Sequence, residues 1–420
     1  MNLLACGHAA ISGDLRACVH LLVEAPPEHV RLLTGVAVGY DLLCEECADS
    51  SEPRSRLLEV CEGCADRADD DSSLRGWRGA PEVRHRDQPV DGSWSSRDYP
   101  LRMANERCLA AVPGGWVALT AEGLFEMTGE GVRHVAPAVL PAEPVREWAG
   151  RVSGPALHAA ADGRYAAVVN DYGQHGLVFD IAIGSTVFTL DRGSYHVETT
   201  PFPVAFVGTG TSTVLIAATD WNRLDTFDAA TGRLLSDRDT TWAKDEKRPE
   251  HYLDYFHGRL TRSPSGRYVL DDGWVWHPVG MPKLIDVQKW LDGDKYAAEH
   301  GTTITYRDYA WDQPVAWLDD GTVAVQRIGS DDEAMLDGVQ LFDVATGRRT
   351  GVFAGPAGPM WAYGGHLYVT APSGLEIWDP AGTRVGHIPG FRPSAQNQVT
   401  GALAELARER LRVWQPTAAG

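Results

Sequence analysis

Short apolar runs alternate with glycine-bearing turns along most of the chain. Six of these runs follow a turn closely, at "GGWVALT" (114), "DGRYAAVV" (162), "GTSTVLIA" (210), "SGRYVLDD" (265), "DGTVAVQ" (320) and "GGHLYVT" (364). They have the length of strands, are rich in β-branched and aromatic residues, and are bounded by turn residues. The pattern therefore predicts six buried strands, each entered through a tight turn.

A second motif follows each run. It consists of an aromatic or aliphatic residue, then in most copies an aspartate, and then a turn of small residues. Clear copies are "FDIAIGSTV" (179), "FDAATGRLL" (227), "FDVATGRRT" (342) and "WDPAGTRVG" (378), and weaker ones are "LFEMTGEGV" (124) and "LIDVQKWLDGDK" (284). We expect the rings to pack between neighbouring units. The aspartates should accept amide hydrogens from the following turn, in which Gly232 and Gly347 supply the positive φ. These structural aspartates are Asp180, Asp228, Asp343 and Asp379.

The two motifs recur together at intervals of roughly 36 to 58 residues. Each unit is interpreted as a four-stranded antiparallel meander, and repeats of this length favour a β-propeller over a sandwich. The fold class is therefore all-β, a propeller of six or seven four-stranded blades preceded by a small zinc-binding module. Seven blades are favoured, because residues 83–105 and the tail "RLRVWQP" can close a last blade from both ends of the ring.

This spacing divides the chain into four parts. Residues 1–75 form a cysteine/histidine zinc-binding module, and residues 76–106 form a linker or the first propeller strands. Residues 107–395 form the propeller repeats, and residues 396–420 form a C-terminal helix and a closing strand. The helix is predicted from the helical spacing of "GALAELARERL" at 401–411, and we expect it to pack outside the ring.

The aromatic–aspartate motifs resemble those of the tryptophan–aspartate-repeat (WD-repeat) propellers and related families. In those proteins the third strand of each blade ends in an aromatic residue and an aspartate. The resemblance covers residues 107 to about 390 and implies a propeller. The glycine–histidine pair that usually accompanies the aspartate in that family is missing here.

Six of the seven cysteines lie in the first 64 residues, and Cys108 lies apart. Two CxxC pairs, separated by thirteen residues, have the spacing of a structural zinc site with four protein ligands: Cys44, Cys47, Cys61 and Cys64. The alternative is four buried or redox-active thiols. The segment is short and polar, so we expect metal, and not a hydrophobic core, to fold it.

A weaker constellation precedes these pairs and consists of two Cys-x-His pairs: Cys6 with His8, and Cys18 with His20. They can form a second zinc site of their own, or cross with the later pairs so that two ions are held by alternating pairs. The spacing does not separate these arrangements. The structural alternative is that the cysteines are core residues and the histidines cap turns. One zinc ion is expected, and a second is compatible with the sequence.

The charge of the chain restricts its partners. Lysine and arginine total 38 against 57 aspartates and glutamates, a formal net charge of −19, which repels phosphate backbones and anionic membrane surfaces. We therefore expect no nucleic acid and no membrane as partner. The sequence also lacks an apolar stretch of membrane-spanning length and a signal peptide, so a cytoplasmic location is expected.

One stretch concentrates histidines and carboxylates among aromatic residues. Its candidates for acid–base chemistry or metal binding are His251, Asp254, His257, Asp272 and His277. The more ordinary interpretation is that the aromatic strands form inter-blade core and that the histidines satisfy backbone groups.

Two functions follow from these patterns. The first is a non-enzymatic scaffold for protein–protein interaction, with a protein or peptide partner and a structural zinc module; no catalytic residue is assigned. The alternative is a propeller hydrolase or lyase that uses His257 and His277 in the central channel. Because a propeller hosts both classes, the fold alone does not choose between them.

Overall fold

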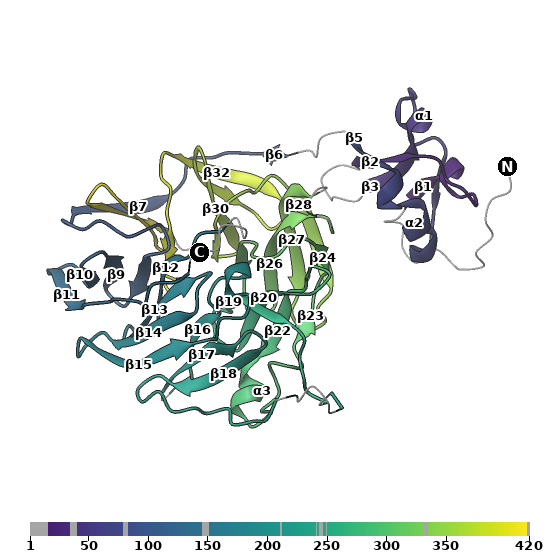
Figure 1. Ribbon diagram of the computed structural model, residues 1–420. Coiled ribbons are helices and arrows are strands. Elements are labelled where there is room, and N and C mark those ends of the chain that lie inside the picture. Colours follow the sequence, from purple (N-terminus) through teal and green to yellow (C-terminus); the bar gives the residue numbers. More distant parts are fainter. Residues whose placement is uncertain are drawn as a thin grey trace.

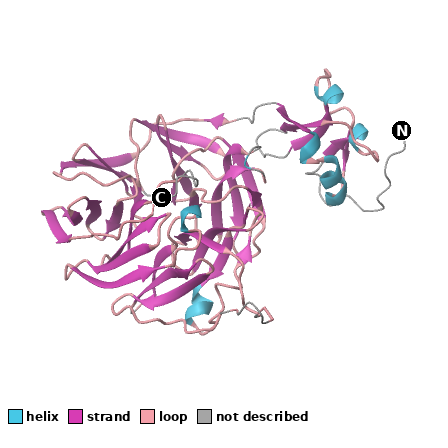
Figure 2. Cartoon of the chain, in the orientation of Figure 1, coloured by secondary structure: helices cyan, strands magenta, loops and turns pink. Residues whose placement is uncertain are grey.

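The structure is a computed structural model that describes residues 16–33, 40–78, 83–144, 151–210, 212–240, 242, 247–248, 250–330, 332 and 335–417. Nearly all regular structure in this part of the chain is β (Figure 2). The described residues form eight sheets. Seven of them are arranged around a ring, and a small N-terminal sheet lies beside it (Figure 1). The fold is a seven-bladed β-propeller, as the repeat pattern predicted.

Three blades are regular four-stranded antiparallel meanders. Blade 1 contains β8 (Leu109–Val112), β9 (Gly115–Thr120), β10 (Gly123–Thr128) and β11 (Gly131–Ala136). Blade 2 contains β12 (Gly154–Ala159), β13 (Tyr165–Asp171), β14 (His175–Asp180) and β15 (Ser185–Asp191). Blade 5 contains β25 (Val315–Trp317), β26 (Thr322–Ile328), β27 (Leu336–Asp343) and β28 (Arg349–Ala354).

Blades 3 and 4 depart from the expected four strands. In blade 3 the described residues form three, β16 (Val204–Gly208), β17 (Thr213–Asp220) and β18 (Arg223–Asp228). Beyond its third strand, a single bridge from Phe227 to Leu234 is recorded. Blade 4 has six: β19 (Phe256–Arg262), β20 (Tyr268–Val275), β21 (Val279–Gly280), β22 (Lys283–Asp286), β23 (Thr302–Thr303) and β24 (Arg307–Asp308). Its short helix α3 (Val287–Leu291) begins where Asp286 accepts a hydrogen bond from the Lys289 amide.

The last two blades use residues from the N-terminal side of the ring. Blade 6 contains β29 (Met360–Tyr363), β30 (His366–Ala371), β31 (Gly374–Trp378) and β32 (Thr383–Pro389), with β6 (Arg84–His85) added in parallel to β32. Blade 7 contains β33 (Ala395–Gln396), β34 (Leu403–Ala407) and β35 (Arg410–Pro416), and β7 (Gly92–Asp98) pairs with β35 along its whole length. Within the stretch 76–106, β6 and β7 are propeller strands, whereas residues 76–78 end the N-terminal sheet. The ring is closed by both ends of the repeat region.

The predicted helix at 401–411 is wrong, because β34 and β35 form a hairpin there. Alanine, leucine, glutamate and arginine favour a helix locally. In the ring, however, Leu403, Ala404 and Leu406 are buried between blades 6, 7 and 1. Arg408 and Glu409 take φ of 50° and 66° in the two-residue turn, the geometry of a tight hairpin. Tertiary pairing overrides the local preference.

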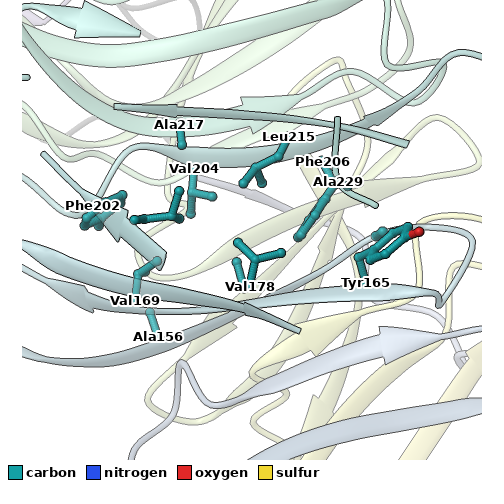
Figure 3. Close-up of a cluster of buried hydrophobic side chains, with 13 residues drawn as sticks. Ala156, Tyr165, Val169, Val178, Phe202, Val204, Phe206, Leu215, Ala217 and Ala229 are labelled. Atoms are coloured by element: carbon teal, nitrogen blue, oxygen red, sulfur yellow. The ribbon is translucent and has the colours of Figure 1, made fainter. Parts of the chain in front are cut away.

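Each pair of neighbouring blades encloses its own buried apolar cluster in the described part of the chain. Figure 3 shows the one between blades 2 and 3, where Val169 and Val178 face Val204 and Leu215. Because the core is divided among these interfaces, the ring depends on every blade meeting two neighbours.

The aromatic residues of the repeat motif lie in these clusters. Phe179, Phe342 and Trp378 are buried and pack against the preceding blade. Phe227 is half-buried against the cluster between blades 2 and 3. Each following aspartate accepts a backbone N–H of the next turn, from Ile183 to Asp180, from Ala230 and Thr231 to Asp228, from Thr346 to Asp343 and from Thr383 to Asp379. Gly232 and Gly347 have φ of 70° and 68°.

The N-terminal sheet has the strand order β4-β1-β3-β2-β5. Its strands are β1 (Arg16–Cys18), β2 (His29–Leu33), β3 (Tyr40–Cys44), β4 (Leu57–Glu59) and β5 (Leu74–Arg78), with short helices η1 (Val19–Leu21), α1 (Glu45–Ala48), α2 (Glu62–Ala68) and η2 (Asp71–Ser73). Ala17, Val30, Leu42 and Leu43 are buried together with cysteines. The module thus has a small core of its own, contrary to our expectation that metal alone would fold it.

Candidate metal centre and the aromatic face of the ring

Two chain segments of the N-terminal module each present two metal-ligating side chains. Cys18 ends β1, and His20 lies in the η1 turn that follows it. Cys44 ends β3 and precedes α1, so that Cys47 lies one turn into that helix. Since β1 and β3 are adjacent parallel strands, their ends bring the two pairs together.

The four ligand atoms of this group lie within 4.8 Å of one another. The Nδ1 atom of His20 is 3.2 Å from Cys47 Sγ and 3.4 Å from Cys44 Sγ. Bond lengths of about 2.0–2.3 Å from zinc to nitrogen and sulfur separate tetrahedral ligands by about 3.5–3.8 Å, so a single ion fits this spacing. Three thiols and an imidazole also form a closed donor set of the structural type. The group can hold a metal ion.

The surroundings of the thiols control their charge. Cys18, Cys44 and Cys47 are all buried, and the Cys44 amide donates a hydrogen bond to Cys18 Sγ at 3.3 Å. Burial, with the neighbouring Cys44, raises the pKa of Cys18, and burial and the adjacent thiols raise the pKa of Cys47 to about 12. The thiols of Cys18 and Cys47 are therefore neutral at pH 7 unless a cation stabilises the thiolates.

The grouping selects one of the arrangements that the sequence left open. Cys18 and His20 meet Cys44 and Cys47, which is the crossed arrangement, whereas the expected sharing of one ion by both CxxC pairs is not what the described residues show. Cys61 caps the N-terminus of α2, and Cys64 lies inside that helix. Cys6 and His8 lie outside the described residues.

The five residues predicted as a possible acid–base cluster are dispersed. Buried His257 bonds through Nδ1 to Asp271 at 2.6 Å, and Asp272 accepts the Gln313 amide at 2.6 Å. His251 stacks on Tyr296 and contacts His300, while Asp254 and His277 are exposed. Among the described residues, no hydrogen bond or ion pair joins two of the five. The sequence did not indicate Asp271 or His300 as the partners.

The aromatic residues of the same stretch instead form a continuous cluster with rings from other loops, in which Phe256 and Trp274 are buried and Tyr195 and Trp276 are exposed. Phe256 stacks on Trp274 at 4.4 Å, Trp274 stacks on Trp311 at 4.8 Å, and Trp221 contacts Phe256 at 4.5 Å between ring centroids. We call this cluster the aromatic face; its members are Tyr195, His196, Trp221, Phe256, Trp274, Trp276 and Trp311. Tyr195 and Trp276 are 48% and 44% exposed, and both contact His196.

The loops that carry the aromatic face are held in place by buried polar groups. The guanidinium of buried Arg192 donates to the carbonyls of Gly173, Val197, Thr200 and Pro201. The indole N–H groups of Trp274 and Trp311 both donate to Thr199, to its hydroxyl and its carbonyl respectively. These bonds tie the loop before β16 to blade 4 and to the loop before β25.

Backbone strain is concentrated at this end of the ring. Eight non-glycine residues in the described chain have positive φ, and four of them are in these loops: His196, His277, Tyr309 and Asp312. A fifth, Tyr172, lies in the turn between β13 and β14, and its hydroxyl bonds to Asp312. Each such conformation costs about 1–3 kcal/mol and persists only where the surroundings impose it. The conformation of Asp312 is held by Arg151, Arg259 and the hydroxyl of Tyr172, which all donate hydrogen bonds to its carboxylate.

The strand order and the Cys/His group together define the class of protein: a seven-bladed β-propeller with an N-terminal module that can hold a metal ion. A search of solved structures finds the crystal structure of the mitotic checkpoint complex, with a TM-score of 0.49 and 14% identity, covering 80% of this chain and 96% of that chain. It also finds the WD40 domain of Pan2 from Neurospora crassa, with a TM-score of 0.48 and 12% identity, covering 80% of this chain and 98% of that chain.

No protein-family model matches the chain, and the search of curated proteins returned no match. The propeller assignment therefore rests on the strand order of this chain. In the described residues, every helix is too short or too polar to cross a membrane.

Proposed function

We propose that this protein is a non-enzymatic interaction scaffold whose aromatic face binds a protein or peptide partner, and whose N-terminal module is stabilised by a structural zinc ion. The observation that carries the proposal is the exposure of large aromatic side chains on rigid, strained loops at one end of the ring.

The composition of the face supports a protein partner. Six tryptophan and tyrosine side chains are exposed in the described chain, and three lie on these loops: Tyr195, Trp276 and Tyr309. The amide of Tyr309 donates to the carbonyl of Pro278, so the Tyr309 backbone lies beside the loop that carries Trp276. Tryptophan and tyrosine are the residues most enriched at interface hot spots, because they bury a large area at a low cost in side-chain entropy.

Rigidity of the loops supports the same function. Arg192 and Asp312 hold the backbone beneath the face through several hydrogen bonds each. A surface that is already ordered loses little conformational entropy on binding, so more of the contact energy appears as affinity.

The donor set of the metal centre supports zinc. Thiolates select soft or borderline ions, and three cysteines with one histidine make a common tetrahedral zinc set in proteins. Since protein groups fill all four positions, the ion would hold β1 and β3 together and would leave no position for a substrate.

The test is a pull-down from the native host with the tagged full chain. The double variant Tyr195→Ala/Trp276→Ala should lose the proteins that the unchanged chain recovers. The control, Ile183→Ser, removes a side chain that is 69% exposed on the outer turn of blade 2; it should recover them all. Equal melting temperatures would show that the ring is intact. Recovery of the same proteins by the double variant would refute the assignment of the face.

A further inference from the structure

The axis of the ring contains a cavity of about 710 Å³, lined by residues of the innermost strand of every blade. These strands are β8, β12, β16, β19, β25, β29 and β33; β12, β16 and β19 are labelled in Figure 1. Alanine, leucine and valine make up about half of the lining residues, and Phe206, Trp317 and Trp361 add aromatic surface. Uncharged polar side chains are also present, at Thr261, Gln396, Asn397, Gln398 and Thr400. An apolar cavity of 300–1,000 Å³ with a few placed polar groups is typical of a site for a small ligand.

The charge in this wall is opposite to that of the chain. The net charge is −19, yet the lining residues include three arginines and one histidine and no carboxylate: Arg107, Arg259, Arg262 and His158. The low-dielectric wall increases the effect of each charge. The channel therefore favours an anion.

Two of the three arginines form ion pairs with aspartates that do not line the cavity. Arg107 pairs with Asp171 at 2.6 Å, and Arg259 pairs with Asp312 at 3.1 Å. Arg262 donates to the carbonyl of Pro264, and among the described residues no carboxylate lies within ion-pair distance of it. Burial lowers the pKa of Arg262 with no carboxylate to oppose it. Arg262 thus contributes a positive charge to the channel that the protein does not balance.

Two neutral polar atoms in the same wall lack hydrogen-bond partners. They are Nε2 of His158, on β12, and Oγ of Ser394, just before β33, and both atoms are buried. Burial lowers the pKa of His158 to about 4, so its imidazole is neutral at pH 7. Leaving a buried polar atom without a partner costs about 1–3 kcal/mol, which a ligand that bonds to it recovers.

We propose that the central channel binds a monocarboxylate with an apolar body, whose carboxylate pairs with Arg262 and whose further polar atoms bond to His158 and Ser394. A guanidinium matches a carboxylate with two parallel hydrogen bonds, and the alanine- and tryptophan-bearing wall accepts the apolar part. The same chemistry comes from a free organic acid or from the C-terminal carboxylate of a short peptide. The proposal does not depend on partner binding at the aromatic face.

The experiment uses dansylglycine, a fluorescent monocarboxylate, titrated into the full-length protein. We expect saturable binding that weakens as sodium chloride is raised. Dansylglycinamide has the same body without the charge, and it should bind at least ten times more weakly. Equal binding of acid and amide, or the absence of saturable binding, would refute the proposal.

Variants assign the binding to the channel. Arg262→Gln should raise the Kd for dansylglycine at least tenfold, Arg262→Lys should restore part of the affinity, and Ser394→Ala should weaken binding less. The matched control is Arg348→Gln, which removes an exposed arginine on the outer turn of blade 5 and should leave the Kd unchanged. A melting curve for each variant separates loss of the site from loss of the fold. Unchanged affinity in a folded Arg262→Gln protein would refute the assignment.

The source of the carboxylate is tested with the dansylated peptide Ala-Ala-Phe as free acid and as C-terminal amide. Preferential binding of the free-acid peptide, lost in Arg262→Gln, would identify a peptide C-terminus as a ligand. Binding of dansylglycine without binding of either peptide would identify a free organic acid.

Discussion

The backbone N–H of Cys44 donates a hydrogen bond to Sγ of Cys18 at 3.3 Å, although the two residues are 26 positions apart in the sequence. N–H···S bonds of this kind stabilise a thiolate next to a metal ion. The bond joins the ends of two neighbouring parallel strands, so the metal centre is built across β1 and β3 and not within one CxxC loop.

Replacing Cys44 and Cys47 by serine should therefore remove one equivalent of zinc and unfold the N-terminal module while the ring remains folded. The metal content measured by elemental analysis checks the first part, and circular dichroism checks the second. Cys108→Ser is the control, because Cys108 is buried between blades 1 and 2, far along the chain from the module. Unchanged zinc in the double variant would contradict the assignment, and two ions per unchanged chain would support a second ligand set.

Metal affinity should rise with pH. The pKa of Cys18 is raised and that of Cys47 is raised to about 12, so both thiols carry protons at neutral pH and must release them when an ion binds. Each released proton makes the apparent affinity about tenfold higher per pH unit. Competition with a zinc chelator at pH 6, 7 and 8 measures this slope. A flat profile would mean that the thiols are not ligands.

Asp272 should make the ring less stable as the pH rises. Burial raises its pKa from 3.8 to about 7, so the folded state prefers the neutral acid. The cost of ionising it is absent below about pH 4, grows through pH 7 and is then constant. The difference between 3.8 and about 7 is equivalent to at most about 4 kcal/mol. Asp272→Asn should thus melt at a higher temperature than the unchanged chain at pH 8, with a smaller difference at pH 5.

Asp320, whose pKa is lowered in the folded protein, is the control for Asp272. Burial raises the pKa of Asp320, but hydrogen bonds from the amide and hydroxyl of Ser265 outweigh it and leave the pKa lowered. Its contribution to stability is present above pH 4 and is lost in acid, so Asp320→Asn should destabilise the protein at pH 8. A stabilising effect of the same size in both variants would show that a general charge effect, and not burial, is responsible.

Closure of the ring should depend on β7. Seven residue pairs join β7 to β35, from Arg410 with Asp98 to Pro416 with Gly92. A chain that starts at residue 83 keeps this strand and should fold as a propeller, whereas a chain that starts at residue 99 leaves blade 7 with an open edge. We expect a much lower melting temperature and concentration-dependent aggregation for the shorter chain. Equal stability of the two would show that β7 does not close the ring.

The repeat pattern was sufficient for the architecture because it is a local signal. Strand length, glycine turns and the aromatic–aspartate corner at residues 342–347 are each encoded within a few neighbouring residues. The sequence left the count at six or seven blades and favoured seven, since a ring requires its two ends to pair. The helix prediction for residues 401–411 failed because the helical preference of that segment is local, whereas the pairing of β35 with β7 joins distant parts of the chain.

By itself, the sequence determined the β-propeller, the presence of candidate metal ligands near the N-terminus and the net acidic charge. Only the tertiary structure decided which ligands share an ion, because strand adjacency in the module pairs Cys18 with Cys44 across 26 positions. The tertiary structure also showed that the aromatic residues of the stretch 251–277, and not its histidines, form a cluster. Tyr195 and Trp221 contact Phe256, and Trp311 contacts Trp274, from other loops. Contacts between distant segments depend on how the blades are placed, and no spacing within one segment encodes that.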